Sequence, residues 1–331
     1  MRINWRIVFG LVISVAALAL VLKNVNLSEV ASALATANYW WIIPTTAILL
    51  VTTWTRGMRW RALLDDRISP SRSFWIANAG NLLNNVLPFR IGELGRAYMA
   101  SRNSTVTTMQ SLSTVLIERL LDVLSVFGML VVVFPFVSTE GWLVKAGMSA
   151  AAVAFVGVAG LFVAAALRPQ VMRMARAMLG WMRPGWREAL LHRADDFLQG
   201  VSAAGGRPLL SAMLWSALVW AGWGLASWTF LLAFVPGAKL YMGLFVTCAM
   251  ALSLSIPSAP SGAGLYEAAA VAGLAVFKVA PDVALAYALL LHVLSFVLIG
   301  VLGTIGLDRE GESFKHITAS AQSMLASARG K

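Results

Sequence analysis

Apolar segments of about twenty residues constrain this chain more than any other feature. Of its 331 residues, 59% are hydrophobic and 12% are charged, and the mean hydropathy is +0.76. Soluble domains carry about 25% charged residues. A chain of this composition must expose most of its surface to lipid rather than to water. We therefore predict an all-α, polytopic integral membrane bundle.

Six segments approach or exceed the ~20 residues that cross a ~30 Å hydrocarbon core; they are residues 7–22, 39–55, 106–136, 142–167, 209–234 and 282–306. The first resembles a signal peptide with a cleavage site at Ala35-Thr36-Ala37, but that site lies too far beyond the apolar run. We predict a retained first helix and about six full transmembrane helices in total.

The arginines set the predicted orientation. Five arginines lie from Arg56 to Arg72 and seven from Arg168 to Arg207. The opposite connections carry at most one basic residue each, near Lys23, Glu140, Lys239 and Lys278. Since basic loops stay in the cytoplasm, we predict a bacterial inner-membrane protein with both termini cytoplasmic and a basic cytoplasmic connector at 168–207.

The same composition excludes several soluble functions. The net charge of +11 comes with arginines beside apolar segments, so it indicates membrane orientation rather than nucleic-acid binding. The sequence contains no Walker loop, dinucleotide fingerprint, His-Glu-x-x-His or Cys-x-x-Cys pair, and it has a single cysteine, Cys248. We predict no metal, no cofactor and no nucleic-acid partner.

The segment from Phe74 to Leu87 lies between two cytoplasmic arginine groups, so it must return to the side on which it began. Its fourteen residues rise about 21 Å as a helix, which does not cross the hydrocarbon core. Pro88 breaks that helix, and the chain climbs back from Glu93. We predict a re-entrant helical hairpin with Pro88 and Gly92 at its hinge or tip.

A second broken segment, residues 240–279, is predicted to enter and leave from the outer face, although residues 240–256 could instead span the membrane. Its hinge or tip residues are Pro257, Pro260, Gly262 and Gly264.

The two broken segments align with each other. Pro88 aligns with Pro257 and, after one inserted residue, Gly92 with Gly262. Inverted repeats with broken helices are typical of transporters. We therefore predict a first repeat at 39–136 and a second at 209–306, in opposite orientations.

Three ionisable residues, Glu118, Arg119 and Asp122, lie in one apolar segment. They fall roughly 18–24 Å along a helix of ~45 Å, and Arg119 can pair with Asp122. Each charge costs about 2.5–3.5 kcal/mol at the membrane centre, so all three must face a bundle interior or a wet cavity. They form either a structural clamp or a clamp that is also a substrate or proton path. The expected clamp partners are Arg90, Glu93 or Arg96.

Three motifs occur together in this chain: NLLNNVLPFRIGELGRAYMASR, VLIERLLDVL and PSGAGLYEAAA. In combination they resemble the lysylphosphatidylglycerol synthase transmembrane region, a flippase-like family of membrane proteins. The resemblance covers roughly residues 7–307 and implies one membrane domain, 1–307, that moves an aminoacylated or glycosylated lipid between leaflets. The motif positions are Asn81, Pro88, Gly92, Glu93, Arg96, Glu118, Arg119, Asp122, Pro257, Gly262 and Glu267.

Two features depart from the family pattern. The sequence ends shortly after its last predicted helix, so we expect a polar cytoplasmic tail at 308–331, no aminoacyl-transferring domain and no enzymatic activity. His292 stands where repeat symmetry predicts an arginine, near the position that corresponds to Arg119.

A charged lipid headgroup needs a polar route through the membrane. Arg90 and Arg96 are expected to pair with its phosphate, because guanidinium geometry suits phosphate. Four carboxylates are expected to face a cationic part of the headgroup or to carry protons: Glu93, Glu118, Asp122 and Glu267. His292 either titrates or forms a packed hydrogen bond. Asn81 and Asn85 either line the cavity or cap broken backbone.

The expected partners are membrane lipids, and two other functional classes are compatible with the sequence. One is a small-solute or ion secondary transporter built on the same repeat. The other is a non-catalytic scaffold for a separately encoded lipid- or glycan-modifying enzyme. The basic connector is expected to lie on the anionic inner leaflet, or to bind such an enzyme.

Overall fold

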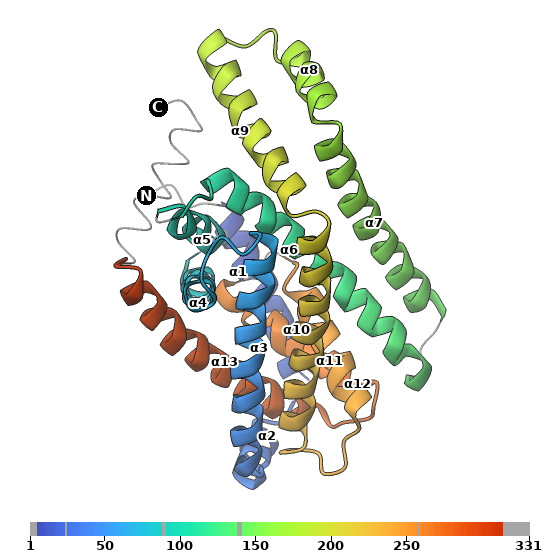
Figure 1. Cartoon of the computed structure of the whole chain (residues 1–331). Coiled ribbons are helices and arrows are strands. Elements are labelled where there is room, and N and C mark those ends of the chain that lie inside the picture. Colours follow the sequence, from blue (N-terminus) through green and yellow to red (C-terminus); the bar gives the residue numbers. More distant parts are fainter. Residues whose placement is uncertain are drawn as a thin grey trace.

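The computed structural model describes residues 5–23, 25–87, 91–102, 104–137, 141–256 and 259–313. Within these ranges the chain forms thirteen α-helices, a few short 3₁₀ turns and no strand (Figure 1). The predicted all-α class is confirmed, and the apolar helices are those of a helical membrane protein.

Eight of the helices form two sets of four with the same order of lengths. The first set contains 22, 17, 12 and 26 residues: α3 (Ile42–Leu63), α4 (Pro70–Val86), α5 (Ile91–Arg102) and α6 (Thr108–Val133). The second contains 25, 14, 11 and 29 residues: α10 (Arg207–Leu231), α11 (Leu240–Ser253), α12 (Leu265–Ala275) and α13 (Pro281–Arg309). Each set is therefore a long helix, two short helices and a long helix.

The two sets pack on each other reciprocally. α3 and α10 lie side by side and run in opposite directions (Figure 1). α4 of the first set packs on α13, the last helix of the second, while α11 packs on α6, the last helix of the first. The α4–α5 pair lies above the α11–α12 pair in the view of Figure 1.

Local sequence signals set the helix boundaries. α4 begins at Pro70, and the hydroxyl of Ser69 accepts a hydrogen bond from Arg72 N at 3.3 Å. α6 begins with a capping box, in which Thr107 and Gln110 each bind the other's backbone N–H. Because Ser69 caps α4 at Pro70, the helix that the sequence predicts over residues 74–87 starts four residues earlier than expected.

Each short pair of helices is surrounded by its own apolar core. The first joins α4 and α5 to α3 and α13 through buried side chains that include Trp60, Ile76 and Met99. The second joins α11 and α12 to α10 and α13. Glycines let α13 approach α4 closely, because a Cβ atom at Gly306 would lie 2.4 Å from Trp75 O.

Two described helices, α10 and α13, are long and apolar enough to cross a membrane, and bent pairs would raise that number to four. α3 and α6 have comparable lengths but carry several charges each. α11, at 14 residues, is about 21 Å long and so shorter than a ~30 Å core.

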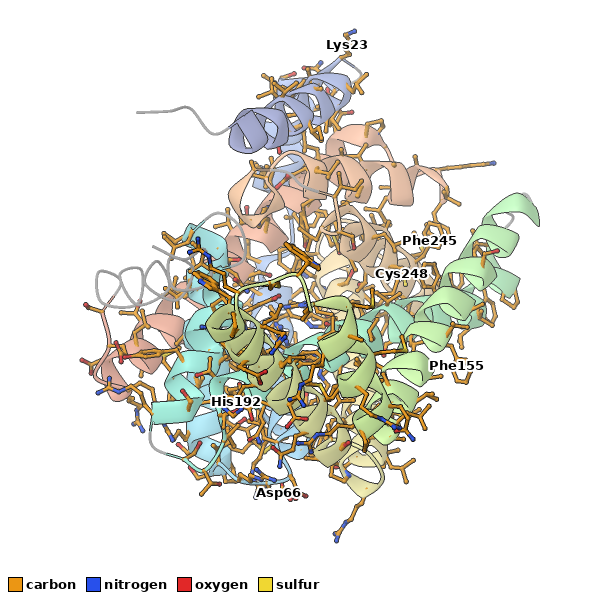
Figure 2. All side chains as sticks on the ribbon, turned by 90° about the horizontal axis from the view of Figure 1, so that it is seen from above. Lys23, Asp66, Phe155, His192, Phe245 and Cys248 are labelled. Carbon is orange, nitrogen blue, oxygen red and sulfur yellow. The ribbon has the colours of Figure 1, made fainter. Side chains whose placement is uncertain are left out.

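The remaining helices lie at the margins of the bundle. α1 (Trp5–Leu22) packs on α12, where Ser14 Oγ accepts a hydrogen bond from Ala259 N at 2.8 Å. α2 (Leu27–Thr36) follows it, and Figure 2 shows Lys23, between these helices, at one edge of the outline. α7 (Gly141–Ala166) lies at another edge, marked by Phe155. Cys248 is buried inside the bundle, beside Phe245.

The predicted polar tail is anchored at its start. Glu310 forms an ion pair with Arg72 at 2.9 Å, and Glu312 forms another with Arg102. Residues 308 to 313 therefore continue the folded domain, and residues 314–331 lie outside the described part of the chain.

The basic connector forms two helices, α8 (Arg168–Met178) and α9 (Pro184–Ala203), which project from the bundle (Figure 1). The axis of α8 is bent by 89° from that of residues Phe155–Ala166 in α7. α8 exposes large apolar side chains, among them Met174 and Met178.

The ion pair between Arg168 and Asp195 fastens α8 to α9, and its hydrogen bonds lower the pKa of the Asp195 carboxyl. Such a pair contributes fully above the unfolded aspartate pKa of about 3.9 and is lost as the pH falls through the lower folded value. We expect D195N to loosen α8 at neutral pH, measured as faster amide hydrogen exchange, whereas D196N leaves α8 unchanged. In the wild-type protein, the protection of the α8 amides against hydrogen exchange should fall on strong acidification. Equal exchange of these amides in wild type, D195N and D196N would contradict this prediction.

Candidate functional site: a buried ionic cluster

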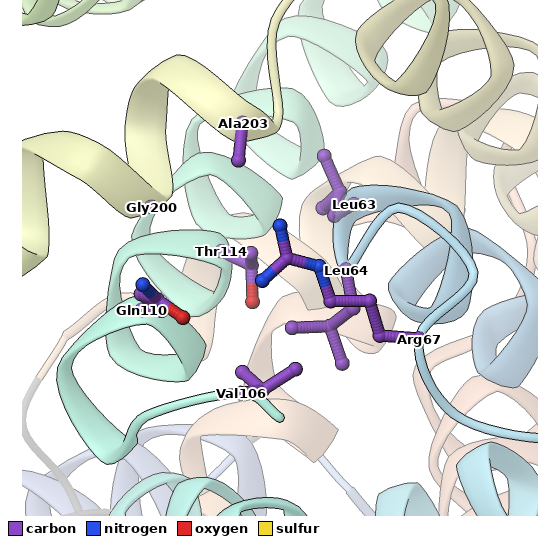
Figure 3. Close-up of a pocket in the computed structure, with 8 residues that line it drawn as sticks. All are labelled: Leu63, Leu64, Arg67, Val106, Gln110, Thr114, Gly200 and Ala203. Atoms are coloured by element: carbon purple, nitrogen blue, oxygen red, sulfur yellow. The ribbon is translucent and has the colours of Figure 1, made fainter. Parts of the chain in front are cut away.

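A small recess opens between α3, α6 and α9 (Figure 3). Its volume of about 10 Å³ holds about one water molecule, so it does not accommodate a lipid headgroup. Its lining residues are Leu63, Leu64, Arg67, Val106, Gln110, Thr114, Gly200 and Ala203.

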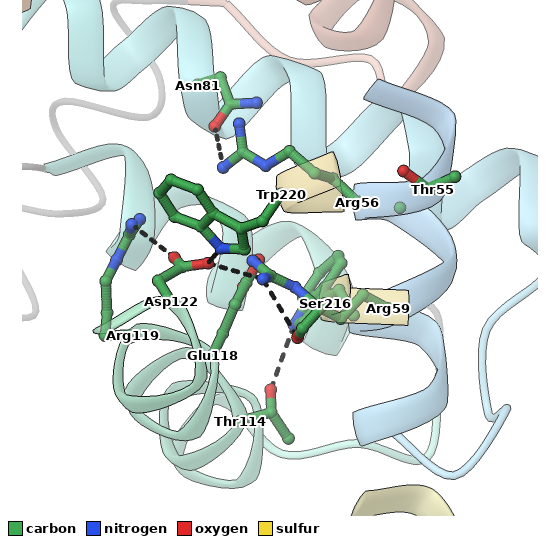
Figure 4. A network of polar contacts seen from close by, with 12 residues as sticks. Thr55, Arg56, Arg59, Asn81, Thr114, Glu118, Arg119, Asp122, Ser216 and Trp220 are labelled. Carbon is green, nitrogen blue, oxygen red and sulfur yellow. Dashed lines mark hydrogen bonds and ion pairs between the residues drawn. The ribbon is translucent and has the colours of Figure 1, made fainter. Parts of the chain in front are cut away.

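The ionisable residues of α6 form a larger feature, a cluster centred on Glu118 (Figure 4). Arg59 Nη2 on α3 donates to Glu118 Oε1 at 2.6 Å, and Arg96 Nη2 on α5 donates to Glu118 Oε2. One carboxylate thus joins three helices. Arg96 also stacks over the ring of Trp60 at 4.3 Å, while the indole N–H of Trp60 donates to Thr114 Oγ1 at 3.1 Å.

Asp122 forms the second centre of the cluster, one helical turn after Glu118. Its Oδ1 accepts from Arg59 Nη1 at 2.6 Å and from the indole N–H of Trp220 on α10 at 3.1 Å. Its Oδ2 accepts from Arg119 at 3.4 Å, the local pairing that the spacing predicts. Arg59 therefore bridges both carboxylates of α6, and α10 joins the cluster.

The cluster runs from a buried centre to a more exposed edge. The side chains of Arg59 and Glu118 are 0% and 1% exposed. At the edge, Arg119 Nε donates to Glu93 Oε1 at 2.9 Å, and these side chains are 34% and 24% exposed. The predicted clamp partners Glu93 and Arg96 are both present in the cluster, whereas Arg90 lies outside the described residues.

Two arginines of the cluster, Arg56 and Arg59, were missed by the sequence analysis, which assigned them to a cytoplasmic loop. α3 continues to Leu63 rather than ending at Thr55, so both lie inside the helix. Arg56 Nη2 donates to Asn81 Oδ1 on α4 at 3.4 Å, and Asn85, one turn further along α4, is half-buried. Asn81 thus belongs to the cluster's α4 side.

Gly92, predicted as a hinge, lies where α5 crosses α4. A Cβ atom at this position would lie 2.0 Å from Gly80 O and 2.8 Å from Asn84 N. The absence of a side chain permits this crossing, which in turn places Arg96 against Glu118.

Glu267 and His292 form a separate pair in the second helix set. Glu267 Oε1 lies 2.6 Å from His292 Nδ1, and Glu267 Oε2 accepts from Gly264 N at 2.6 Å at the start of α12. The ring of Tyr266 lies 4.6 Å from that of His292. Among the described residues, no hydrogen bond or ion pair joins these residues to the cluster around Glu118.

Comparisons with known proteins identify the family of this chain. The profile of the lysylphosphatidylglycerol synthase TM region matches residues 7–303. The chain belongs to this family. Among curated proteins, it is similar to glycosyltransferase AglD of Haloferax volcanii, with 27% identity over 327 residues, covering 86% of this chain and 51% of that protein. The chain thus spans about half the length of this relative, and no solved structure matches it.

The two helix sets of this lysylphosphatidylglycerol synthase TM region place related pairs at related positions. In each set, a carboxylate in the first turn of the second short helix binds a basic side chain on the following long helix. The pairs are Glu93 with Arg119 and Glu267 with His292. The sequence predicts that Arg119 and His292 occupy corresponding positions, and in the structure each binds the carboxylate of the preceding short helix.

The predicted tip residues of the second hairpin form a tight turn before α12. Ser261, Gly262 and Gly264 all have positive φ angles, of 56°, 77° and 85°. A Cβ atom at Gly264 would also lie 2.5 Å from Ser14 O on α1. Pro260 begins the turn, while Pro88 and Pro257 lie outside the described residues.

Within the part of the chain that the structure describes, no group of three or more His, Cys, Asp or Glu residues is placed to hold a metal ion. What the cluster offers instead is paired guanidinium and carboxylate groups in an apolar bundle, with a buried centre and an accessible edge. Such a surface can exchange its internal ion pairs for contacts with a charged ligand.

Proposed function

We propose that this protein translocates a lipid with a charged headgroup between membrane leaflets. Such a lipid would be an aminoacyl-phospholipid or a polyprenyl-phosphate glycan lipid. The observation that carries the proposal is the ionic cluster, in which Arg59, Arg96 and Arg119 meet Glu93, Glu118 and Asp122 within an apolar bundle. Charges at this density are costly in a membrane and mark a substrate or ion path.

We propose an inverted repeat for the membrane topology, with about six full spans and two re-entrant hairpins. The first repeat is 39–136, the second is 209–306, and the connector 168–207 lies in the cytoplasm of a bacterial inner membrane, with both termini on that side. The reciprocal packing of the two helix sets supports this topology, as does the opposite direction of α3 and α10. The short α11 supports the re-entrant alternative for residues 240–256.

In this proposal the acyl chains stay in lipid while the headgroup passes along the cluster. The exposed edge at Arg119 and Glu93 is where a headgroup would first displace an internal partner, because partly solvated pairs are weaker than buried ones. The buried centre at Glu118 then holds α3, α5 and α6 together while the edge opens.

A second candidate function is a non-catalytic membrane scaffold for a separately encoded lipid- or glycan-modifying enzyme. The similarity to about half of a protein named as a glycosyltransferase supports this candidate. In either proposal the chain performs no catalytic chemistry of its own.

The proposed translocation is tested by leaflet exchange in reconstituted liposomes. Tagged phospholipid, aminoacyl-phospholipid and polyprenyl-phosphate lipids are incorporated in turn. Wild-type protein should accelerate the exchange of at least one, and R119Q should reduce that acceleration by about tenfold, since a charged hydrogen bond is worth about 1.5–3 kcal/mol.

The matched control is R61Q, which removes an arginine of similar exposure on α3 that pairs with Asp66 outside the cluster. It should exchange lipid at the wild-type rate. If the wild-type protein accelerates no lipid on the panel, translocation is wrong and the scaffold candidate is favoured.

A further inference from the structure

Arg56 differs from every other arginine of the cluster. Arg59, Arg96 and Arg119 each bind at least one carboxylate. Arg56 has no carboxylate within ion-pair distance among the described residues, and its hydrogen bond to Asn81 Oδ1 is long, at 3.4 Å. It is nevertheless half-buried, one helical turn from the fully buried Arg59.

The charges of the described cluster residues do not balance. Four described arginines (Arg56, Arg59, Arg96 and Arg119) face three described carboxylates (Glu93, Glu118 and Asp122), which leaves one surplus positive charge. The surplus falls on Arg56. Arginine does not lose its proton in proteins, and a half-buried cation in an apolar bundle is costly unless an anion is near.

Among the described residues, the hydrogen-bond partner of Arg56 is the neutral amide of Asn81, while the carboxylates of Glu118 and Asp122 act on it only at longer range. Because Asn81 Oδ1 accepts from Arg56, the Asn81 amide N–H groups face away from this bond and are donors for a further ligand. Asn85 lies one turn away on the same face of α4. A guanidinium with a neighbouring amide donor matches the several acceptor oxygens of a phosphate.

We propose that Arg56 and Asn81 form the binding subsite for the phosphate of the translocated lipid's headgroup. This inference rests on the proposed function and assigns the phosphate, which both proposed lipid classes carry, to two named residues. It also revises the sequence-based role of Arg96, whose guanidinium is already bound to Glu118 and stacked on Trp60. A headgroup that has displaced the edge pair of Arg119 and Glu93 then places its phosphate at Arg56, while Arg59 and Arg96 keep their carboxylate partners.

The subsite is tested by lipid retention, measured without any exchange step. Purified full-length protein is equilibrated with phosphatidylglycerol and a neutral diacyl glycolipid of the same acyl chains, and bound lipid is counted by native mass spectrometry. Wild type should retain phosphatidylglycerol over the glycolipid, and R56Q should lose that preference by about tenfold or more. R61Q, the same substitution on the same helix, should retain it. Equal retention by wild type and R56Q would overturn the subsite.

A second variant, N81D, tests the subsite even if R56Q does not fold. In N81D, a carboxylate inside the chain would pair with Arg56 and neutralise the surplus charge. We expect N81D to unfold at the wild-type temperature or above and still to lose phosphatidylglycerol retention. A stable N81D protein that keeps wild-type retention would contradict the proposal.

Two further measurements complete the test. The first distinguishes a lipid phosphate from free inorganic phosphate, and the second distinguishes failure of the Arg56 subsite from failure of translocation. If inorganic phosphate binds with the same dependence on Arg56 and displaces the phospholipid, the ligand is a solute anion and the lipid assignment is overturned. If retention depends on Arg56 but no leaflet exchange occurs, the subsite holds and translocation fails. If exchange occurs equally in wild type and R56Q, translocation holds and the subsite fails.

Discussion

Replacing Glu118 with glutamine is expected to lower the stability of the folded protein by about 3–5 kcal/mol. The carboxylate is almost fully buried and binds two arginines, Arg59 through Oε1 and Arg96 through Oε2. Glutamine keeps the shape but leaves both guanidinium groups facing a neutral amide, whose nitrogen is itself a donor. We therefore expect E118Q to unfold at a much lower temperature than wild type in the same detergent.

The matched control for E118Q is E93Q, at the exposed edge of the same cluster. Glu93 binds only Arg119 among the described residues, and both side chains are partly exposed. Pairs of this kind contribute about 1 kcal/mol or less. E93Q should therefore unfold close to the wild-type temperature. Equal losses in E118Q and E93Q would show that burial does not set the strength of these pairs.

The members of the cluster on α5 and α6 could be predicted from the sequence because their cost in lipid is large. Three charges within five residues of an apolar helix have to be paired, and the polar hairpin before them supplies the only nearby partners along the chain. The structure places Glu93 and Arg96 there. The local pair of Arg119 with Asp122 followed from helical spacing alone.

Arg59 could not be recognised by the same reasoning, because counting arginines for the positive-inside rule treats each as a loop residue. The available signal was the lack of a helix breaker between Thr55 and Pro70, which would have extended the preceding helix. A helix extended in this way continues the apolar segment and contains Arg56, Arg59 and Trp60. Two residues of α10 gave no such signal: Trp220, which binds Asp122, and Ser216, whose hydroxyl accepts a hydrogen bond from Arg59 Nη1 at 3.4 Å. Their partners lie about a hundred or more residues away in the chain, and only the packing of α10 on α3 and α6 brings them close.

The sequence assigned Glu267 the same headgroup role as the carboxylates around Glu118, whereas the structure places it in a separate group for a physical reason. Glu267 finds its own partners locally, since it caps α12 through Gly264 N and binds His292 on the next helix. Because these partners already bind both oxygens of the Glu267 carboxylate, it does not require an ion pair with the arginines around Glu118. The order of breaks in the sequence predicted two similar sets of helices, while the position of the charges depended on which partners each carboxylate reaches.

Replacing Gly92 with alanine is expected to destabilise the protein by about 3 kcal/mol, at the upper end of overpacking costs. The new Cβ atom would lie 2.0 Å from Gly80 O and 2.8 Å from Asn84 N. Both are backbone atoms and cannot rotate away, so α5 must move away from α4. G128A on α6 is the matched control, because a Cβ atom there meets no heavy atom within 4 Å. It should unfold at the wild-type temperature or slightly above.

The displacement of α5 in G92A should also carry Arg96 away from Glu118, because Arg96 lies one turn along the same helix. We therefore expect the folded fraction of G92A to lose lipid exchange as well as thermal stability, whereas G128A retains both. Removing the Asn84 side chain in a double variant should restore neither, since the shortest contact is with the Gly80 carbonyl. Recovery in that double variant would mean that the Asn84 side chain, rather than the backbone crossing, sets the spacing of α4 and α5.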